Sequence, residues 1–374
     1  GYTNNGSATQ NIVNIASSTV AGGIYGGYVY ATGNVASNSV HIANSTVSGW
    51  VCSGYTYNGN AVSNSVDIAS STVTSGVYGG YAHDTGNAVS NSVAIASSTV
   101  KDSVYGGYVE NGDVISNNVT IKDSTVNKQV YGGNVDETGN ANQNKVTIAS
   151  STTSDVIGGY VGNGSATQNI VTIASSTTGA VNGGGATTGS ANLNEVYIDN
   201  SIVSKVFGGN VNTSDENLAN ALENKVYITS STVNENVYGG YVWTVFDGST
   251  GSVTKNEVHI ASSTVTGSVY GGYVGGNGNA TDNTVEISGG SEVKGSVYGG
   301  DATGDAKTGN KLIISGTGNK IGGIAKNFEY VSFKLASDDD TSKSMLSVLS
   351  LDAAMDLNLV KLDTELPESG LNGE

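Results

Sequence analysis

The sequence contains no arginine, a single cysteine, a single proline and very few large apolar side chains. Phe, Trp and Met together supply only eight of the 374 residues, which is too few for a conventional globular core. Because Cys52 is the only cysteine, an intrachain disulfide is excluded. No apolar run is long enough to span a bilayer as a helix, so we expect no membrane insertion by this segment.

The charge is also one-sided. All 15 basic residues are lysines, against 32 Asp and Glu residues, and the formal net charge is −17. Arginine supplies the planar fork that suits phosphate groups, and nucleic-acid binding requires a basic patch that this chain lacks. We therefore exclude nucleic acid as a partner and disfavour anionic membrane surfaces.

What the sequence has in abundance is glycine, with small polar and β-branched residues, arranged in a repeat. A Gly-Gly pair, usually preceded by Val-Tyr or Ile-Tyr, recurs at intervals of mostly 25–28 residues. Clear copies lie at 24–27, 77–80, 104–107, 237–240 and 297–300. A repeat of this length and composition is typical of a solenoid, in which each unit buries its apolar face only against its neighbours.

A second column of the repeat is Asn-x-Val-x-Ile or a close variant, and its asparagine is present in all twelve units. Side chains alternate along a strand, so Asn38, Val40 and Ile42 face one side and Ser39 and His41 the other. The middle residue of the motif varies between units, as solvent permits, whereas the Val and Ile positions hardly vary. We therefore predict an all-β fold, a parallel β-helix (β-solenoid) of about twelve three-strand coils.

An inward asparagine needs partners, because an unpaired buried amide costs a few kcal/mol. In a stack of coils, each side-chain amide can bond to the coil beside it. We interpret the column as a structural asparagine ladder with no catalytic role. Its members are Asn11, Asn38, Asn64, Asn91, Asn117, Asn144, Asn169, Asn194, Asn224, Asn256, Asn283 and Asn310.

The repeat ends near residue 323. We assign residues 1–323 to the solenoid and 324–374 to a C-terminal cap or transition segment, because an open solenoid end exposes unpaired strand edges. Residues 328–335 are predicted to include a strand. The sequence begins inside a repeat, at Gly1-Tyr2, so we expect it to be a piece of a longer chain.

Two adjacent coils carry insertions at the same corner. Most coils have 11 residues from the second glycine of the pair to the next ladder asparagine, but Gly209 to Asn224 takes 15 and Gly240 to Asn256 takes 16. Such insertions often form the binding side of a solenoid. The candidate binding residues at this corner are Trp243, Phe246, Asp247, Asn212, Asp215 and Glu216. The alternative is that the loops fold their aromatic side chains back onto the solenoid.

The tyrosines that precede Gly-Gly form a third column, in which Tyr238 and Tyr270 are further candidate binding residues. They alternate out of phase with the preceding valine, so an outward column would offer rings and hydroxyls to a glycan or a protein. The alternative is that the rings stack on one another and stiffen the solenoid.

The Val-Tyr-Gly-Gly-Tyr and Gly-Asn-Ala-x-x-Asn-x-Val-x-Ile repeats, followed by Asn-Phe-Glu-Tyr-Val-Ser-Phe at 327–333, resemble the passenger region of type V autotransporter proteins of Gram-negative bacteria. The resemblance covers the whole chain. It implies a right-handed parallel β-helix that is secreted or displayed at the cell surface, exported through an outer-membrane barrel absent from this chain. It also implies an adhesin or an extended scaffold, with a host glycan or surface protein as the hypothetical partner.

No catalytic constellation is visible, and we expect a protein that is not an enzyme and uses neither a cofactor nor a metal ion. His41, His83 and His259 lie in different coils, and the Gly-x-Ser-x-Gly motif of a nucleophile elbow is absent. The alternative left open is a carbohydrate-active β-helix enzyme, such as a glycoside hydrolase or a lyase-like protein. Its carboxylates would come from the inserted loops, because a glycoside hydrolase needs two that flank a cleft.

Overall fold

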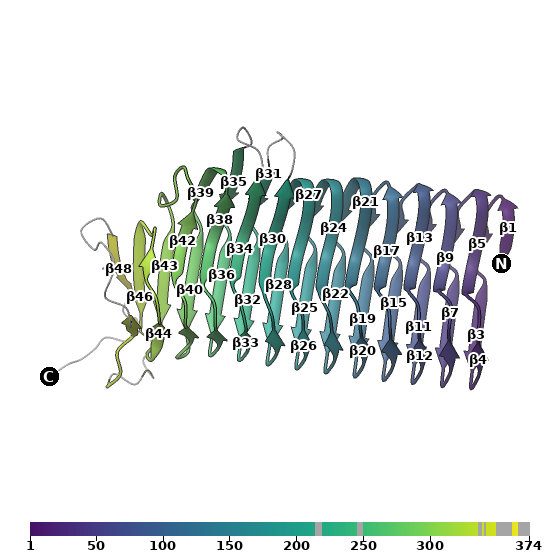
Figure 1. Cartoon of the computed structure of the whole chain (residues 1–374), viewed down its shortest axis with the longest axis horizontal. Helices are drawn as coiled ribbons and strands as arrows, with labels where there is room; N and C mark the ends of the chain where they lie inside the picture. Colours follow the sequence, from purple (N-terminus) through teal and green to yellow (C-terminus); the bar gives the residue numbers. More distant parts are fainter. Residues whose placement is uncertain (214–218, 245–249, 336–338, 340–341, 349–360, 366–374) are drawn as a thin grey trace. The chain divides into compact units, whose positions relative to one another are not determined.

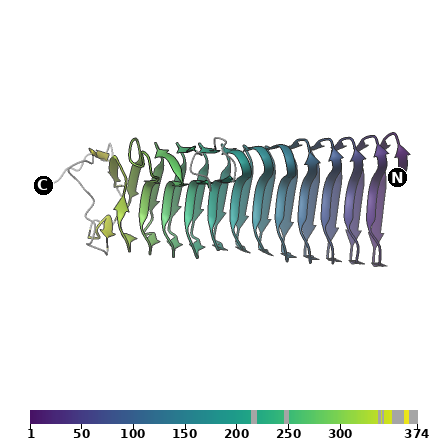
Figure 2. The same cartoon turned by 45° about the horizontal axis from the view of Figure 1, so that its top comes forward.

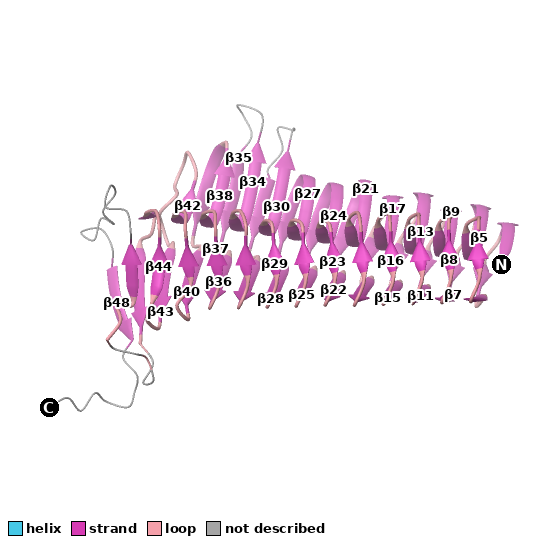
Figure 3. Ribbon diagram, turned by 60° about the horizontal axis from the view of Figure 1, so that its bottom comes forward, coloured by secondary structure: helices cyan, strands magenta, loops and turns pink. Residues whose placement is uncertain are grey.

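The computed structural model describes residues 1–213, 219–244, 250–335, 339, 342–348 and 361–365. Every regular element among them is a β-strand, and the strands pair in parallel in three sheets (Figures 1 and 3). The strands wind as a β-solenoid of about twelve turns. The predicted all-β parallel solenoid of three-strand coils is therefore confirmed.

The chain divides into two compact units, Gly1–Val196 and Tyr197–Glu374. The boundary falls inside strand β28 (Glu195–Asp199) of sheet 2. In the first unit, sheet 1 contains β1 (Tyr2–Asn5), β2 (Ala8–Thr9), β5 (Ile24–Thr32), β6 (Val35–Ala36), β9 (Val51–Asn58), β10 (Ala61–Val62), β13 (Val77–Thr85), β14 (Ala88–Val89), β17 (Val104–Asn111), β18 (Val114–Ile115), β21 (Val130–Asn142), β24 (Val156–Thr167) and β27 (Val181–Asn192). Sheet 2 contains β3 (Ile12–Ala16), β7 (Ser39–Ala43), β11 (Ser65–Ala69), β15 (Ser92–Ala96), β19 (Asn118–Lys122), β22 (Lys145–Ala149) and β25 (Ile170–Ala174). Sheet 3 contains β4 (Thr19–Val20), β8 (Thr46–Val47), β12 (Thr72–Val73), β16 (Thr99–Val100), β20 (Thr125–Val126), β23 (Thr152–Thr153) and β26 (Thr177–Thr178).

The second unit repeats this arrangement. Its strands in sheet 1 are β30 (Val206–Thr213), β31 (Ala219–Leu222), β34 (Val237–Thr244), β35 (Thr250–Thr254), β38 (Val269–Gly275), β39 (Asn277–Thr281), β42 (Val297–Asp301) and β45 (Ala325–Lys326). Those in sheet 2 are β32 (Lys225–Thr229), β36 (Glu257–Ala261), β40 (Thr284–Ser288), β43 (Lys311–Ser315), β46 (Tyr330–Lys334) and β48 (Lys361–Glu365). Those in sheet 3 are β29 (Ile202–Val203), β33 (Thr232–Val233), β37 (Thr264–Val265), β41 (Glu292–Val293), β44 (Asn319–Ile321) and β47 (Leu346–Val348).

Equivalent residues of successive coils pair in register. In the first unit, β7 pairs with β11 so that Val40 lies beside Val66. In the second, β32 pairs with β36 so that Val226 lies beside Val258. Figure 2 shows the strands of consecutive coils side by side. Inward valines of successive coils consequently form columns of buried side chains. Together with the buried isoleucines of sheet 2, they make up the core. Burial confirms the face assigned to the Val and Ile positions.

Each coil turns into and out of sheet 2 at a residue with a left-handed backbone. In one coil φ is 56° at Ser90, just before Asn91, and 49° at Ser97, just after β15. Short polar side chains tolerate this conformation better than most, which accounts for the Ser, Asn and Asp residues at many of these corners. Gly86 forms a further corner with φ of 140°, where a Cβ atom would lie only 1.9 Å from the Gly59 carbonyl oxygen, so glycine is required.

Strand β46 continues sheet 2 past the last Gly-Gly pair. It pairs in parallel with β43, with Leu312 beside Val331 and Ile314 beside Phe333. The strand predicted within 328–335 is therefore confirmed as Tyr330–Lys334. The division at 323/324 between a solenoid and a distinct cap stays a prediction.

Candidate functional site

The asparagine column lies inside the coils. The backbone N–H and the Nδ2 amide of Asn91 both donate to Oδ1 of Asn117, at 2.9 and 3.0 Å, and the same Nδ2 donates to the Ala61 carbonyl at 2.9 Å. Asn117 repeats the pattern, donating to Oδ1 of Asn144 and to the Ala88 carbonyl. Each side chain therefore satisfies its own polar atoms and those of its neighbours. The buried members are Asn38, Asn64, Asn91, Asn117, Asn144, Asn169, Asn194, Asn224, Asn256, Asn283 and Asn310, whereas Asn11 is half-buried.

The Gly-Gly pair makes room for this column. A Cβ atom on Gly80 would lie 2.4 Å from Cγ of Asn91, and one on Gly79 would lie 2.5 Å from the Gly106 carbonyl oxygen and 3.2 Å from Cβ of Asn91. Two consecutive positions thus face inward, which breaks the alternation of the strand. As a result Tyr78 and Tyr81, on either side of the pair, emerge on the same outer face, with ring centroids 5.2 Å apart.

The tyrosines form two adjacent columns rather than one. Before Gly-Gly, Tyr105 stacks on Tyr78 at 4.9 Å and on Tyr131 at 5.0 Å, with interplanar angles of 4° and 2°. After Gly-Gly a second column includes Tyr81 and Tyr108, whose centroids are 4.6 Å apart. The predicted self-stacking is therefore present in the column before Gly-Gly, whereas Tyr81 and Tyr108 meet edge to face, at 74°. The second column was missed, although Gly-Gly-Tyr was readable in the sequence.

The same columns run through the second unit. Tyr270 lies between Tyr238 and Tyr298, at 4.9 and 4.8 Å, and Tyr241 stacks on Tyr273 at 5.1 Å. Burial is the main cause that raises the pKa of Tyr241 and of Tyr270 to about 12. Tyr238 is only 8% exposed, so little of its ring is open to a partner. Tyr270 is half-buried.

The insertion corner is assembled by strand pairing. Asn212 pairs with Trp243 and Thr213 with Thr244, where β30 and β34 end. Beyond the insertions β31 pairs with β35. The stems of both insertions therefore lie side by side. Asp215, Glu216, Phe246 and Asp247 fall outside the described residues.

Trp243 is exposed at this corner, with 42% of its surface open. A Cβ atom on Gly275 would lie 2.1 Å from the indole Cε3, so the ring rests on the backbone of the next coil. Its column neighbours Asn212 and Gly275 have no ring to stack on it. Trp243 thus differs from the stacked tyrosines. Sequence reasoning did not identify the glycine beneath it.

A shallow hollow lies on the strands that follow this corner. It is lined by Thr250, Gly251, Ser252, Asn277, Gly278, Asn279, Thr303 and Gly304. In the residue that follows Trp243, Oγ1 of Thr244 is buried and has no hydrogen-bond partner among the described residues. A Cβ atom on Gly276 would come within 1.9 Å of that oxygen. The corner therefore combines an exposed ring and an unused hydroxyl, with a shallow depression on the strands that follow.

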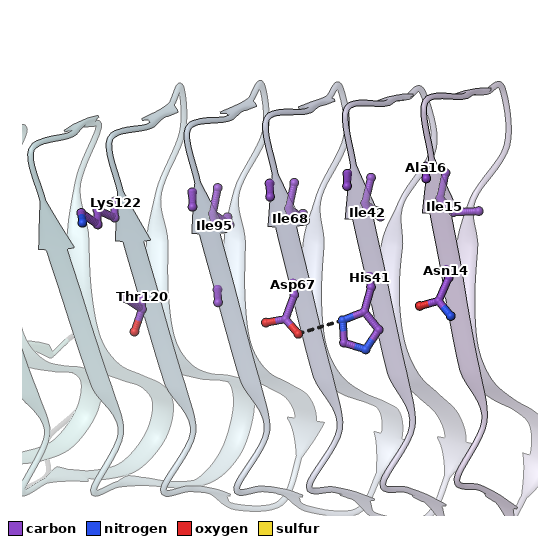
Figure 4. Close-up of a pocket in the computed structure, with 14 residues that line it drawn as sticks. Asn14, Ile15, Ala16, His41, Ile42, Asp67, Ile68, Ile95, Thr120 and Lys122 are labelled. Carbon is purple, nitrogen blue, oxygen red and sulfur yellow. Dashed lines mark ion pairs between the residues drawn. The ribbon is translucent and has the colours of Figure 1, made fainter.

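A second depression, a shallow groove, crosses β3, β7, β11, β15 and β19 on the outer face of sheet 2 (Figure 4). The alanine that follows each inner isoleucine leaves the groove open; these residues are Ala16, Ala43, Ala69 and Ala96. His41 Nδ1 lies 3.0 Å from an Asp67 carboxylate oxygen within it, and both side chains are exposed. The variable middle residues therefore face solvent here, as alternation predicts.

The three histidines remain in separate places. His259 lies 3.0 Å from Glu286 and 3.3 Å from Glu257; these hydrogen bonds, that to Glu286 foremost, raise the pKa of His259 above its ordinary value. The same contact lowers the pKa of Glu286. Among the described residues no group of three or more His, Cys, Asp and Glu side chains is placed to hold a metal ion. Cys52 is buried, and burial raises the pKa of its thiol.

Comparisons with protein-family models, with curated proteins and with solved structures found no match to this chain. No helix in the described ranges is long and apolar enough to cross a membrane. A functional argument therefore depends on the arrangement of the chain's own residues.

Proposed function

We propose that this chain is a secreted or cell-surface β-solenoid that acts as an adhesin or extended scaffold and contacts its partner at the insertion corner. The observation that carries the proposal is Trp243. It is a large exposed ring, it stands where two adjacent coils depart from the regular repeat, and it rests on Gly275. The partner class that fits is a host glycan or a surface protein.

Exposing an indole to water carries a free-energy cost. Tryptophan buries more apolar area than any other side chain, and an exposed one rimmed by polar groups is typical of a binding site. The stacked tyrosines cover one another's faces, whereas Trp243 has no stacking partner in its column. The exposed part of an aromatic ring can contact a sugar ring or enter a protein pocket, and tryptophan is enriched at interface hot spots.

The coils also supply a rigid support for such a contact. Asn256 donates to Oδ1 of Asn283 with both its backbone N–H and its Nδ2, each at 3.0 Å, directly beneath this part of sheet 1. A binding group on a strand held in this way is placed more reproducibly than one on a free loop. The surface location and the outer-membrane tether rest on the resemblance to autotransporter passengers.

The test is a pair of tryptophan variants. Trp243→Ala is expected to weaken binding to host cells or to glycans on an array by about tenfold or more, the loss of one hot-spot side chain. Trp50→Ala is the matched control, because Trp50 is 43% exposed, lies in the first unit and leans on Tyr78. Both variants are expected to melt close to the wild type.

Equal binding by wild type and Trp243→Ala would remove the site from this corner. Equal loss in both tryptophan variants would instead indicate general stickiness of exposed rings. A collapsed melt of Trp243→Ala would show that the indole is a packing group.

A further inference from the structure

We propose that the outer face of sheet 1 in Gly1–Val196 binds an extended peptide segment rich in arginine or lysine. One column of outward residues defines this face across five coils: Tyr30, Tyr57, His83, Glu110 and Asp136. Each follows a residue paired in register with its neighbours, as Ala82 pairs with Val109 and Val109 with Val135. We call this column the aromatic–acidic column.

Its first half offers partly exposed aromatic rings. Tyr30 is 59% exposed and Tyr57 is 41% exposed. Tyr57 stacks on His83 with ring centroids 4.9 Å apart and an interplanar angle of 12°. Tyr81 borders His83 at 5.9 Å from the next column. An open tyrosine face attracts a cation through the ring quadrupole, and guanidinium groups pack on such faces most readily.

Its second half is acidic, and a register irregularity between β17 and β21 falls at its acidic residues. Strand β21 pairs with β17 through Val135 on Val109 and Thr138 on Asn111, so β21 holds an extra residue between these pairs. This β-bulge leaves Asp136 and Glu137 consecutive and both exposed. With Glu110 of the previous coil they place three carboxylates in one small area.

Neutral donors orient two of these carboxylates. Asn111 Nδ2 donates to Glu137 at 2.9 Å, Asn134 Nδ2 donates to one oxygen of Asp136 at 2.7 Å, and the Tyr108 hydroxyl donates to the other. None of these donors carries charge.

The face has no lysine to offset this charge. The long strands of sheet 1 in this unit, β5, β9, β13, β17, β21, β24 and β27, contain no lysine at all. The nearest basic group is His83, whose Nδ1 lies 3.5 Å from Glu110. The lysines of the same unit lie outside these strands; Lys128, for example, forms an ion pair with Asp102. The face is therefore negative as well as aromatic.

Charge and shape together select the occupant. Carboxylates match a guanidinium or ammonium group through ion pairs, and exposed tyrosine rings match the same groups through ring contacts, so different cationic side chains of one peptide can use the two halves of the column. The column crosses successive coils, so it can engage several side chains of one extended peptide. The proposal does not depend on Trp243, which lies in the other unit.

The experiment uses fluorescein-labelled octa-arginine and fluorescence anisotropy on the intact chain. The triple variant Glu110→Gln, Asp136→Asn and Glu137→Gln is expected to weaken binding about tenfold or more. Adding Tyr57→Ala to this triple variant is expected to weaken binding further. The matched control, Asp67→Asn, Asp123→Asn and Glu195→Gln, removes the same number of charges in and beside sheet 2 of the same unit. It is expected to change binding much less.

A chain of net charge −17 attracts any polycation, so the comparison of the two triple variants decides the matter. Equal weakening in both would mean attraction to the overall charge, and the proposal would fail. Unchanged binding in the first triple variant would also overturn it. Thermal melts close to the wild type exclude unfolding as the cause, and Trp243→Ala is expected to leave octa-arginine binding intact.

Discussion

Replacing Asn117 with alanine is expected to lower the free energy of unfolding by about 1–3 kcal/mol, the usual effect of leaving buried polar groups unpaired. Asn117 is fully buried and accepts two hydrogen bonds from Asn91. It also donates through Nδ2 to Asn144 and to the Ala88 carbonyl. Alanine removes the acceptor for Asn91 and the side-chain donor for the other two groups. Chemical denaturation measures the difference.

Asn117→Asp is expected to be worse near neutral pH. The carboxylate can still accept from Asn91, but it would face Oδ1 of Asn144 and the Ala88 carbonyl without a proton to donate. A buried carboxylate is also desolvated, which favours its protonated form, so stability relative to the wild type should partly recover at pH 4.5. Asn118→Ala is the control, because its side chain is half-buried on the outer face and bonds only weakly to Thr120, at 3.4 Å. If both Asn117 variants unfold with the wild type, the column is not the support described above.

Gly107→Ala is expected to destabilise the chain by about 3 kcal/mol or more, since overpacking and broken buried hydrogen bonds add together. A Cβ atom on Gly107 would lie 2.6 Å from Nδ2 and 2.7 Å from Cγ of Asn117. The methyl group and the amide cannot occupy this space together. Gly22→Ala is the matched control, because nothing lies within 4 Å of its Cβ position and its backbone is not left-handed. Equal melting of the two alanine variants would contradict the close approach.

The asparagine column was predictable because a polar residue at a fixed interval in an otherwise inward pattern has few physical explanations. A second internal column was not predicted. The hydroxyl of Ser98 donates to the Ala96 carbonyl at 2.7 Å and accepts the backbone N–H of Ser71 at 3.0 Å. Serine after a strand has the composition of an ordinary turn, so sequence alone does not distinguish a buried serine column from solvated corners.

The tyrosine faces show where alternation fails as a guide. Period-two reasoning identified the tyrosine before Gly-Gly but not the one after it. Two adjacent glycines at 79 and 80 both face inward, and this resets the phase of everything that follows in the strand. The bulge that brings Asp136 and Glu137 to the surface depends on a similar shift in pairing. Such shifts arise from contacts between coils, which a single strand does not encode.

At the insertion corner the sequence predicted the adjacency but not the packing. Counting residues between Gly-Gly and the ladder asparagine was enough to place the two insertions on neighbouring coils, and the paired stems at Asn212 and Trp243 agree with it. The support of the indole by Gly275 was not predictable, because a glycine at a strand end reads as a turn signal. Whether this corner binds a partner stays a proposal.

The second glycine of the Gly-Gly pair leaves the space that the asparagine amide occupies. A double-mutant cycle with Gly107→Ala and Asn117→Ala, measured by chemical denaturation, tests this arrangement most directly. Truncating Asn117 removes the atoms that the new methyl group would meet. The free energy of unfolding of the double variant should therefore exceed the value expected from adding the two single effects by about 1.5 kcal/mol or more. Effects that add to within about 0.5 kcal/mol would mean that the two residues do not share that space.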